Sequence, residues 1–152
     1  MYVSVIDTPL GKMELRTDDR AVLYFLPAEK NAALSAPEDP VGADAVRQLA
    51  EYFAGTRTAF TVTADPVGTE FQKNVWGALA EIPFGETRTY GEIADAVGRP
   101  GGARAVGGAV GANPVLIMIP CHRIVARDGI GGFSAELWRK RTLLLWEGNG
   151  IF

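Results

Sequence analysis

The chain has 152 residues, which suits one compact domain or a small domain packed on another. It is 47% hydrophobic and 22% charged, the composition of an ordinary globular protein, and it has no low-complexity tract. No basic and apolar leader and no long apolar segment occurs, so we expect neither secretion nor membrane insertion. The formal net charge of −3 argues against indiscriminate nucleic-acid binding, which depends on neutralising phosphates.

The negative charge is concentrated in the first part of the chain. Residues 1–66 contain 6 Lys and Arg against 10 Asp and Glu, whereas residues 67–152 contain 9 against 8. Because the second part is about neutral, we expect any DNA binding there to be modest and sensitive to salt.

Residues 1–66 predict a small antiparallel sheet and one helix. Three short β-rich or alternating segments are separated by turn residues and predict a meander: residues 2–6, 12–16 and 21–26. The proline-containing residues 27–41 predict a surface loop. A helix follows, which ends at Gly55 and has one apolar face formed by Val46, Leu49, Ala50 and Phe53.

The end of this part predicts one more strand and a linker. Residues 60–62 read as the strand, and residues 64–68 as the linker. Nothing in residues 1–66 carries chemistry, so we expect this part to be a scaffold.

The second part begins with a strong helix start. Thr69 and Gln72 have the spacing of a capping box, and the helix that follows ends at Pro83 and Gly85. Its apolar face is formed by Phe71, Val75, Leu79 and Ile82.

Two short helices follow, from Thr89 to Ala94 and from Ala103 to about Val110. The glycine-containing turn between them is typical of a helix-turn-helix, although such pairs are more often structural. The second helix consists mainly of Ala and Gly, and glycine inside a helix costs about 0.5–1 kcal/mol relative to alanine. Either tight packing or the close approach of a partner would explain this surface, from which only Arg104 protrudes.

The stretch from Asn113 to Arg123 contains the only cysteine, Cys121, and the only histidine, His122. Cationic neighbours lower the pKa of a thiol, and His122 and Arg123 follow directly. A buried structural cysteine is the alternative, but we favour a reactive thiol. One cysteine excludes an internal disulfide, and one Cys with one His excludes a structural zinc site of N and S ligands. A thiol that must stay reduced fits a cytoplasmic location.

The sequence Pro-Cys-His-Arg, with Asn-Pro eight residues before the cysteine, resembles the active-site signature of the O6-alkylguanine-DNA alkyltransferases. The resemblance covers about the last eighty residues. Further matching segments are Phe71-Gln72, Val75-Trp76, Ile82 to Thr87, Tyr90-Gly91, Ala103 to Ala109, Asp128-Gly129, Gly132 to Ser134, Leu143-Leu144 and Glu147-Gly148.

This resemblance implies an α+β fold in two domains. Residues 1–66 would form a small antiparallel sheet with a helix, ribonuclease H-like, and residues 67–152 a helical winged helix-turn-helix domain for DNA binding and catalysis. The implied function is direct-reversal DNA repair. The alkyl group of O6-alkylguanine in duplex DNA would pass irreversibly to Cys121 after base flipping, without turnover. O4-alkylthymine stays open as a second substrate. No cofactor, metal or membrane is implied, and the protein would act as a monomer, with cooperative binding on DNA left open.

The resemblance also assigns the catalytic residues. His122 would reach Cys121 through a water molecule and would itself be oriented by Glu147. Tyr90 would hydrogen-bond guanine N3 and give up a proton as the leaving group gains charge. Ser134 would lie near O6, and the backbone of Cys121 and Ile124 would accept from the exocyclic amine.

The remaining assignments concern structure and DNA. Asn113 would tie the turn before the active-site segment, and Arg123 would form a fixing ion pair. Arg104 would take the place of the flipped base, with Ala103 and Thr89 at the DNA surface.

Several residues depart from the family pattern and bear on substrate range and DNA affinity: Leu116, Gly111, Glu136 and the short segment from Gly129 to Gly132. Two rival functions remain. A damage-binding protein without catalysis is one, although alkyltransferase-like relatives lack the cysteine. A cysteine hydrolase with a Cys–His–Glu set is the other, but it would have no use for the small-residue helix that carries Arg104.

Overall fold

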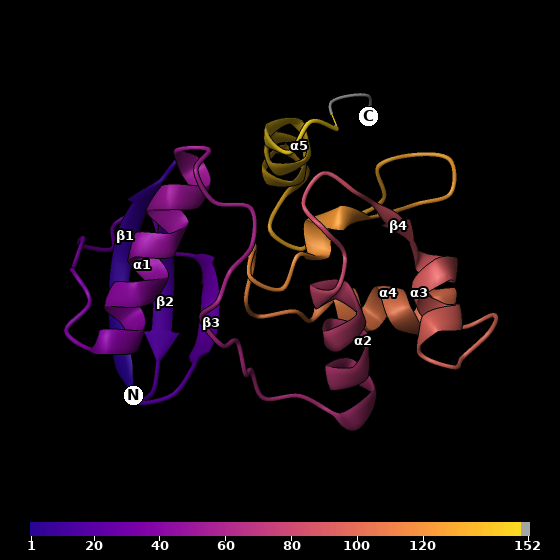
Figure 1. Cartoon of the computed structure of the whole chain (residues 1–152), viewed down its shortest axis with the longest axis horizontal. Coiled ribbons are helices and arrows are strands. Elements are labelled where there is room, and N and C mark those ends of the chain that lie inside the picture. The colour runs from indigo at the N-terminus through magenta and orange to yellow at the C-terminus, as the bar shows by residue number, and fades with distance from the viewer. Residues whose placement is uncertain (150–152) are drawn as a thin grey trace. The chain divides into compact units, whose positions relative to one another are not determined.

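A computed structural model describes residues 1–149 of the chain, which divides between Val67 and Gly68 into two compact units (Figure 1). The first unit contains a three-stranded antiparallel sheet and one helix, and the second is mainly helical. The fold class is therefore α+β, as predicted.

The sheet of the first unit is the meander that the sequence predicts. Its strands are β1 (Tyr2–Thr8), β2 (Gly11–Thr17) and β3 (Val22–Pro27), paired antiparallel in the order β1-β2-β3. Gly11 has a φ of 96°, which only glycine adopts readily, and it opens β2 directly after the turn. Met13 and Leu15 alternate with more exposed neighbours along β2 and are buried in the core.

Helix α1 (Pro40–Phe53) follows the proline-containing loop and stops before Gly55, which has a φ of 79°. Its N-cap, Asp39, is buried and accepts hydrogen bonds from Gly42 N at 2.9 Å and Thr17 Oγ1 at 2.6 Å.

The predicted apolar face of α1 was wrong by about one residue. Ala45, Leu49 and Tyr52 are buried, whereas Ala50 is exposed. Gln48 explains the difference, because its side chain is buried and forms a hydrogen bond with the loop after the helix. Gln48 Nε2 donates to Thr61 Oγ1 at 2.8 Å. A pattern of apolar residues leaves out the polar Gln48, so it places the centre of the buried face of α1 too far from Gln48.

The predicted strand at residues 60–62 was also wrong. Thr61 N donates to Gln48 Oε1 at 2.9 Å instead of to a neighbouring strand. The strand pairing that does occur lies a few residues further along the chain, at Ala64, and involves only Val22 of β3. Val22 N donates to Thr63 O at 2.8 Å, and Asp65 N donates to Val22 O at 2.9 Å.

The second unit contains four helices among its described residues: α2 (Glu70–Ala80), α3 (Tyr90–Ala96), α4 (Ala103–Gly111) and α5 (Leu137–Trp146). The capping box of Thr69 and Gln72 is present as predicted, and Thr89 with Glu92 forms a second one at the start of α3. Val75, Leu79 and Ile82 are buried as predicted, and Phe71 is half-buried.

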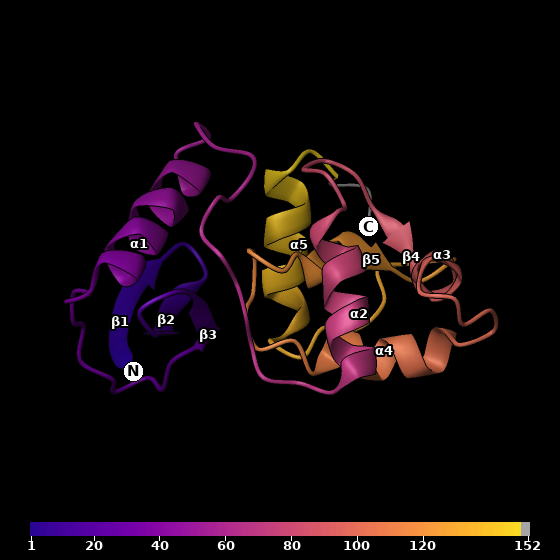
Figure 2. The same cartoon turned by 60° about the horizontal axis from the view of Figure 1, so that its bottom comes forward.

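Helix α2 packs on α3 and α4, and these last two form the expected helix pair (Figure 2). Trp76 of α2 donates through Nε1 to Ala109 O of α4 at 2.9 Å. A single helical turn of 3₁₀ type, η1 (Cys121–Arg123), contacts both α2 and α5. It leads into β5 (Ile124–Val125), which pairs in parallel with β4 (Arg88–Thr89).

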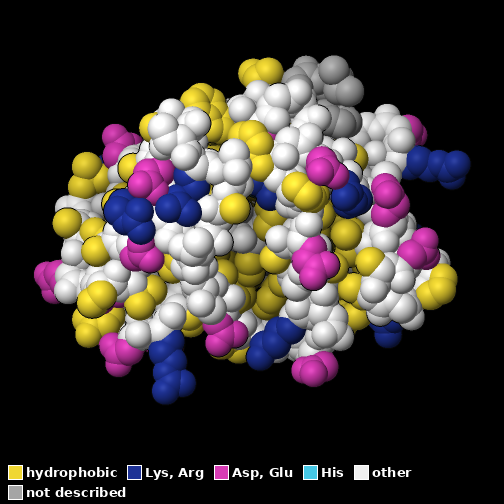
Figure 3. All heavy atoms as spheres, viewed as in Figure 1, with side chains coloured by type: hydrophobic (Ala, Val, Ile, Leu, Met, Phe, Trp, Pro, Cys, Tyr) yellow, Lys and Arg dark blue, Asp and Glu magenta, His cyan; other side chains and the backbone are white. Residues whose placement is uncertain are grey.

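The exposed charges are mixed in sign on the face drawn in Figure 3, where Lys and Arg side chains lie among Asp and Glu side chains. No histidine is visible on that face, in keeping with the burial of His122. Within residues 1–149, no helix has the length and apolar character needed to cross a membrane.

Candidate active site

The segment before Cys121 is buried and fixed by one side chain. Asn113 Oδ1 accepts from Val115 N at 3.0 Å, and Asn113 Nδ2 donates to Ile119 O at 2.9 Å. The loop between them is tight, with Ile117 at a φ of 70°, a conformation that a β-branched residue adopts only under strain. Asn113 therefore closes the loop that leads to Cys121 at the start of η1.

A buried carboxylate connects the two residues that follow the cysteine. Glu147, at the C-terminal end of α5, accepts from His122 Nε2 at 2.8 Å through Oε2. Arg123 approaches the same carboxylate with Nε at 2.7 Å from Oε1 and Nη2 at 3.0 Å from Oε2. Arg123 Nη1 also donates to Ile82 O at 2.7 Å. The structure thus brings together residues 25 positions apart and holds the imidazole in one orientation.

The thiol itself is not activated in the way that the sequence predicted. Cys121 is only 2% exposed, and this burial raises its pKa from 9.0 to about 11. A hydrogen bond from Asn113 and the charge of Lys140 oppose the effect of burial. His122 and Arg123 were expected to lower the pKa of this thiol, and that expectation was wrong because both side chains are engaged by Glu147.

His122 is neutral at pH 7, because its complete burial lowers the pKa of the imidazole. The hydrogen bond and the charge of Glu147 oppose this shift without reversing it. Since Nε2 faces Glu147, the other nitrogen is the one left to take a proton. His122 Nδ1 is buried and has no hydrogen-bond partner among the described residues.

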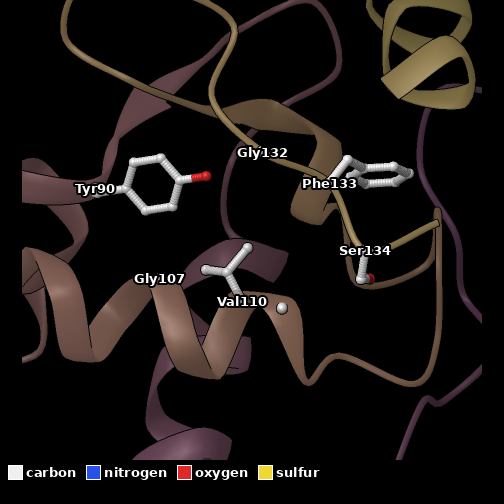
Figure 4. A pocket seen from close by; sticks show the side chains of 7 residues that line it. Tyr90, Gly107, Val110, Gly132, Phe133 and Ser134 are labelled. Atoms are coloured by element: carbon white, nitrogen blue, oxygen red, sulfur yellow. The ribbon is translucent and has the colours of Figure 1, made fainter. Parts of the chain in front are cut away.

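A pocket of about 220 Å³ opens between α3, α4 and the segment before α5. It is lined by Tyr90, Gly107, Val110, Gly111, Gly132, Phe133 and Ser134. Figure 4 shows the Tyr90 hydroxyl pointing across the pocket toward the segment of Gly132 and Ser134, above Val110. This hydroxyl accepts a hydrogen bond from the backbone of Gly132.

Tyr90 is half-buried, and burial is the main reason that its pKa is raised above 10.0. A negative charge on Cys121 would raise the pKa of Tyr90 further, so the two groups lie within electrostatic reach of each other. Cys121 is not among the residues that line the pocket.

The outer surface of α4 is smooth and open. Arg104, Gly108 and Gly111 are exposed, and a Cβ atom added at either glycine would meet nothing within 4 Å. Tight packing therefore does not explain these two glycines, and close approach of a partner stays a prediction.

The other expected site residues lie apart from the pocket. Ile124 is fully buried in β5, Thr89 caps α3, and Ala103 begins α4. Arg104 does not line the pocket. Within residues 1–149, no group of three or more His, Cys, Asp and Glu could hold a metal ion.

Lys140 is the residue that sequence reasoning missed. It is fully buried in α5, and its Nζ donates to Gly132 O at 2.9 Å. Burial lowers the pKa of Lys140 from 10.5 to about 8. It stands in a run of cations that reads as a solvated surface, yet it is spaced three, four and seven residues from the buried Leu143, Leu144 and Glu147. That helical spacing was the signal that could have found it.

Comparison with known proteins identifies the family. Residues 1–66 match the family model for the ribonuclease-like domain of 6-O-methylguanine DNA methyltransferase. Residues 70–149 match the model for the DNA-binding domain of the same protein. The chain belongs to the 6-O-methylguanine DNA methyltransferase family.

Members of this family resemble the chain over nearly its whole length. A methylated-DNA–protein-cysteine methyltransferase of Methanosarcina acetivorans is 42% identical, with 98% of this chain and 99% of the relative covered. One of Mycobacterium tuberculosis is 43% identical, with 97% and 92% covered.

Solved structures of the family agree with the fold. The crystal structure of the Mycobacterium tuberculosis O6-methylguanine methyltransferase has a TM-score of 0.86 at 42% identity, with 97% of this chain and 93% of that chain covered. The structure of the Mycobacterium tuberculosis protein in complex with DNA has a TM-score of 0.85 at 44% identity, with 94% and 90% covered.

Proposed function

We propose that this member of the family is a methylated-DNA–protein-cysteine methyltransferase that repairs O6-methylguanine in duplex DNA, with Cys121 as the acceptor. The enzyme class and DNA as partner follow from the relatives and from the DNA complex described above. The observation that carries the assignment of the acceptor is the buried hydrogen bond between His122 and Glu147, directly beside the only thiol of the chain.

In the proposed reaction, His122 Nδ1 takes the thiol proton through a water molecule, while Glu147 holds Nε2. The Cys121 sulfur then attacks the alkyl carbon, the bond from that carbon to O6 breaks, and its electron pair remains with guanine. Tyr90 supplies a proton at N3 as charge develops there, with its raised pKa keeping it protonated until then. Ser134 lies beside O6, and the backbone of Cys121 and Ile124 accepts from the exocyclic amine.

The base must leave the stack to reach the thiol, which costs a few kcal/mol. The open surface of α4 allows close approach to DNA, and Arg104 fills the gap that the base leaves. Thr89 and Ala103, at the starts of α3 and α4, complete the DNA surface. Residues 1–66 act as a scaffold, and residues 67–152 carry DNA binding and catalysis.

The thioether product has no leaving group that water can displace, and the chain holds no second thiol to remove the alkyl group. Each molecule therefore reacts once, and we propose that it acts as a monomer. We place the protein in the cytoplasm, where its thiol stays reduced.

The decisive experiment incubates the protein with duplex DNA that carries a radiolabelled O6-methyl group in excess. We expect about one methyl group per chain on the wild type and none on Cys121→Ser, because a serine hydroxyl is far less acidic than a thiol. Label on the serine variant would refute the acceptor, and continued turnover would refute the single reaction. DNA binding without transfer by the wild type would favour a damage-binding protein. A matched duplex with O4-methylthymine decides whether that base is also a substrate.

A further inference from the structure

A turn directly after β5 exposes two charged side chains. Gly129 N donates to Ala126 O at 3.4 Å, so the chain reverses over residues 126–129, here called the β5 turn. Arg127 and Asp128 occupy its two central positions, and both are exposed. None of the ion pairs among residues 1–149 includes Arg127, although Asp128 is next to it in the chain. The guanidinium group of Arg127 is therefore open to an anion from outside the chain.

The other exposed cations of the helical unit are engaged or lie elsewhere. Arg99 stacks over an aromatic ring, with 4.6 Å between its Cζ and the ring centroid. Arg104 is the single cation of α4 and has been assigned to the gap in the base stack. Lys73 and Arg141 lie on α2 and α5, and neither helix contributes a residue to the pocket described above. Among the described residues of this unit, Arg127 is thus the exposed cation left to meet the DNA backbone beside the pocket.

Arg127 lies close to the pocket. Together with Thr89 and Asp128 it lines an open hollow of about 540 Å³ between the β5 turn and the start of α3. Gly131 packs against both the hollow and the pocket. A Cβ atom at Gly131 would lie 3.1 Å from the Tyr90 hydroxyl and 3.1 Å from the backbone nitrogen of the first residue of the β5 turn. The hollow and the pocket therefore share one wall.

A base that enters the pocket takes its own backbone with it. The phosphates on either side of that nucleotide stay bonded to its sugar, so they come to lie at the rim of the pocket. Thr89 Oγ1 accepts from Glu92 N at 3.2 Å, which leaves its O–H as a donor. The hollow thus offers a phosphate one guanidinium group, from Arg127, and one hydroxyl. The carboxylate of Asp128 is the opposing charge in its lining.

We propose that the β5 turn is a further DNA contact of this protein, in which Arg127 binds a phosphate next to the extruded nucleotide and Asp128 limits the strength of that contact. This inference rests on the proposed function, in which a methylated base leaves duplex DNA and enters the pocket of Tyr90. It gives a chain with a net charge of −3 a local cation at the place where the duplex is opened.

The test measures binding to a duplex that carries O6-methylguanine across a series of salt concentrations. Every chain also carries Cys121→Ser, so that the base is not repaired during the titration. Arg127→Gln removes the proposed contact. Arg141→Gln is the matched control, because it removes an exposed cation of α5 and changes the net charge equally. We expect Arg127→Gln to weaken binding about fivefold at about 0.1 M salt and to reduce the slope of log affinity against log salt by about one. Arg141→Gln should keep the slope of the parent.

Asp128→Asn tests the same contact in the opposite direction. Removing the carboxylate should strengthen binding about twofold at low salt, and tighter binding cannot result from misfolding. An unchanged slope in Arg127→Gln, equal losses in Arg127→Gln and Arg141→Gln, or no gain in Asp128→Asn would each overturn the proposal. Methyl transfer by the wild type is measured separately. Its absence would refute the proposed function, while the salt slopes would still decide whether Arg127 contacts a phosphate.

Discussion

At the scale of single residues, the buried carboxylate of Glu147 accepts hydrogen bonds from two groups, the imidazole of His122 and the guanidinium group of Arg123. Removing its charge leaves Arg123 buried without its partner, which typically costs 3–5 kcal/mol. It also frees the imidazole that we assign as the base.

We therefore expect Glu147→Gln to lower the free energy of unfolding by about 3 kcal/mol and to slow methyl transfer about a hundredfold. Urea unfolding and single-turnover transfer measure the two effects. Glu136→Gln is the matched control, since it neutralises an exposed carboxylate at the opposite end of α5. A Glu147→Gln variant that transfers methyl at the wild-type rate would contradict the role of Glu147 as orienter of His122.

At the scale of elements, α4 is a helix whose stability and proposed function oppose each other. Gly108 lies in its interior with open space where a side chain would be. Substitution by a helix-forming residue should stabilise the fold by about 0.5–1 kcal/mol. A long side chain at this position would at the same time keep a DNA backbone away from the helix.

The prediction is that Gly108→Met raises the unfolding midpoint and weakens binding to duplex DNA at least tenfold. Gly77→Met is the control, because Gly77 is also an exposed glycine inside a helix with open space beside it, but in α2. Thermal unfolding and a fluorescence binding titration distinguish them: both variants gain stability, and only Gly108→Met loses affinity. Equal affinities would mean that α4 does not meet DNA.

The sequence predicted those helices and strands whose boundaries depend on residues close together in the chain. The capping box of Thr69 and Gln72, the glycine that ends α1 and the three strands depend on neighbours in sequence, and each was found. The face of α1 and the strand at residues 60–62 depended on Gln48, whose buried amide replaces a strand partner. In the active site, the pairing of His122 with Glu147 came from the family resemblance, because only folding brings the two together. Lys140 was missed because charged residues are expected at the surface.

At the scale of the whole molecule, Lys140 should make stability depend on pH. Its pKa is about 8 in the folded chain, against 10.5 when exposed, so the unfolded chain binds this proton more tightly. The folded state is therefore penalised below pH 8, and the penalty disappears as the pH rises from 8 to 10.5.

We accordingly expect Lys140→Met to be more stable than the wild type near pH 7, by about 2 kcal/mol after the loss of one hydrogen bond. The difference should shrink above pH 8 and change sign before pH 10.5, where the charge penalty is gone and only the lost hydrogen bond remains. Cys121 acts in the opposite direction, since its raised pKa lowers stability between pH 9 and 11, but it does so in both proteins. Urea unfolding across this pH range measures the difference, and a constant difference would show that Lys140 is not a strained cation.

The burial of Cys121 affects how long its thiol stays unmodified in the absence of substrate. If each molecule reacts once, as proposed, it is lost to repair whenever the thiol of Cys121 reacts with peroxide or another electrophile. Cys121 is 2% exposed and protonated at rest, with a pKa of about 11, so it offers such reagents neither access nor a thiolate. Under the proposed function, burial and a raised pKa would therefore protect the resting thiol until a base has entered the pocket.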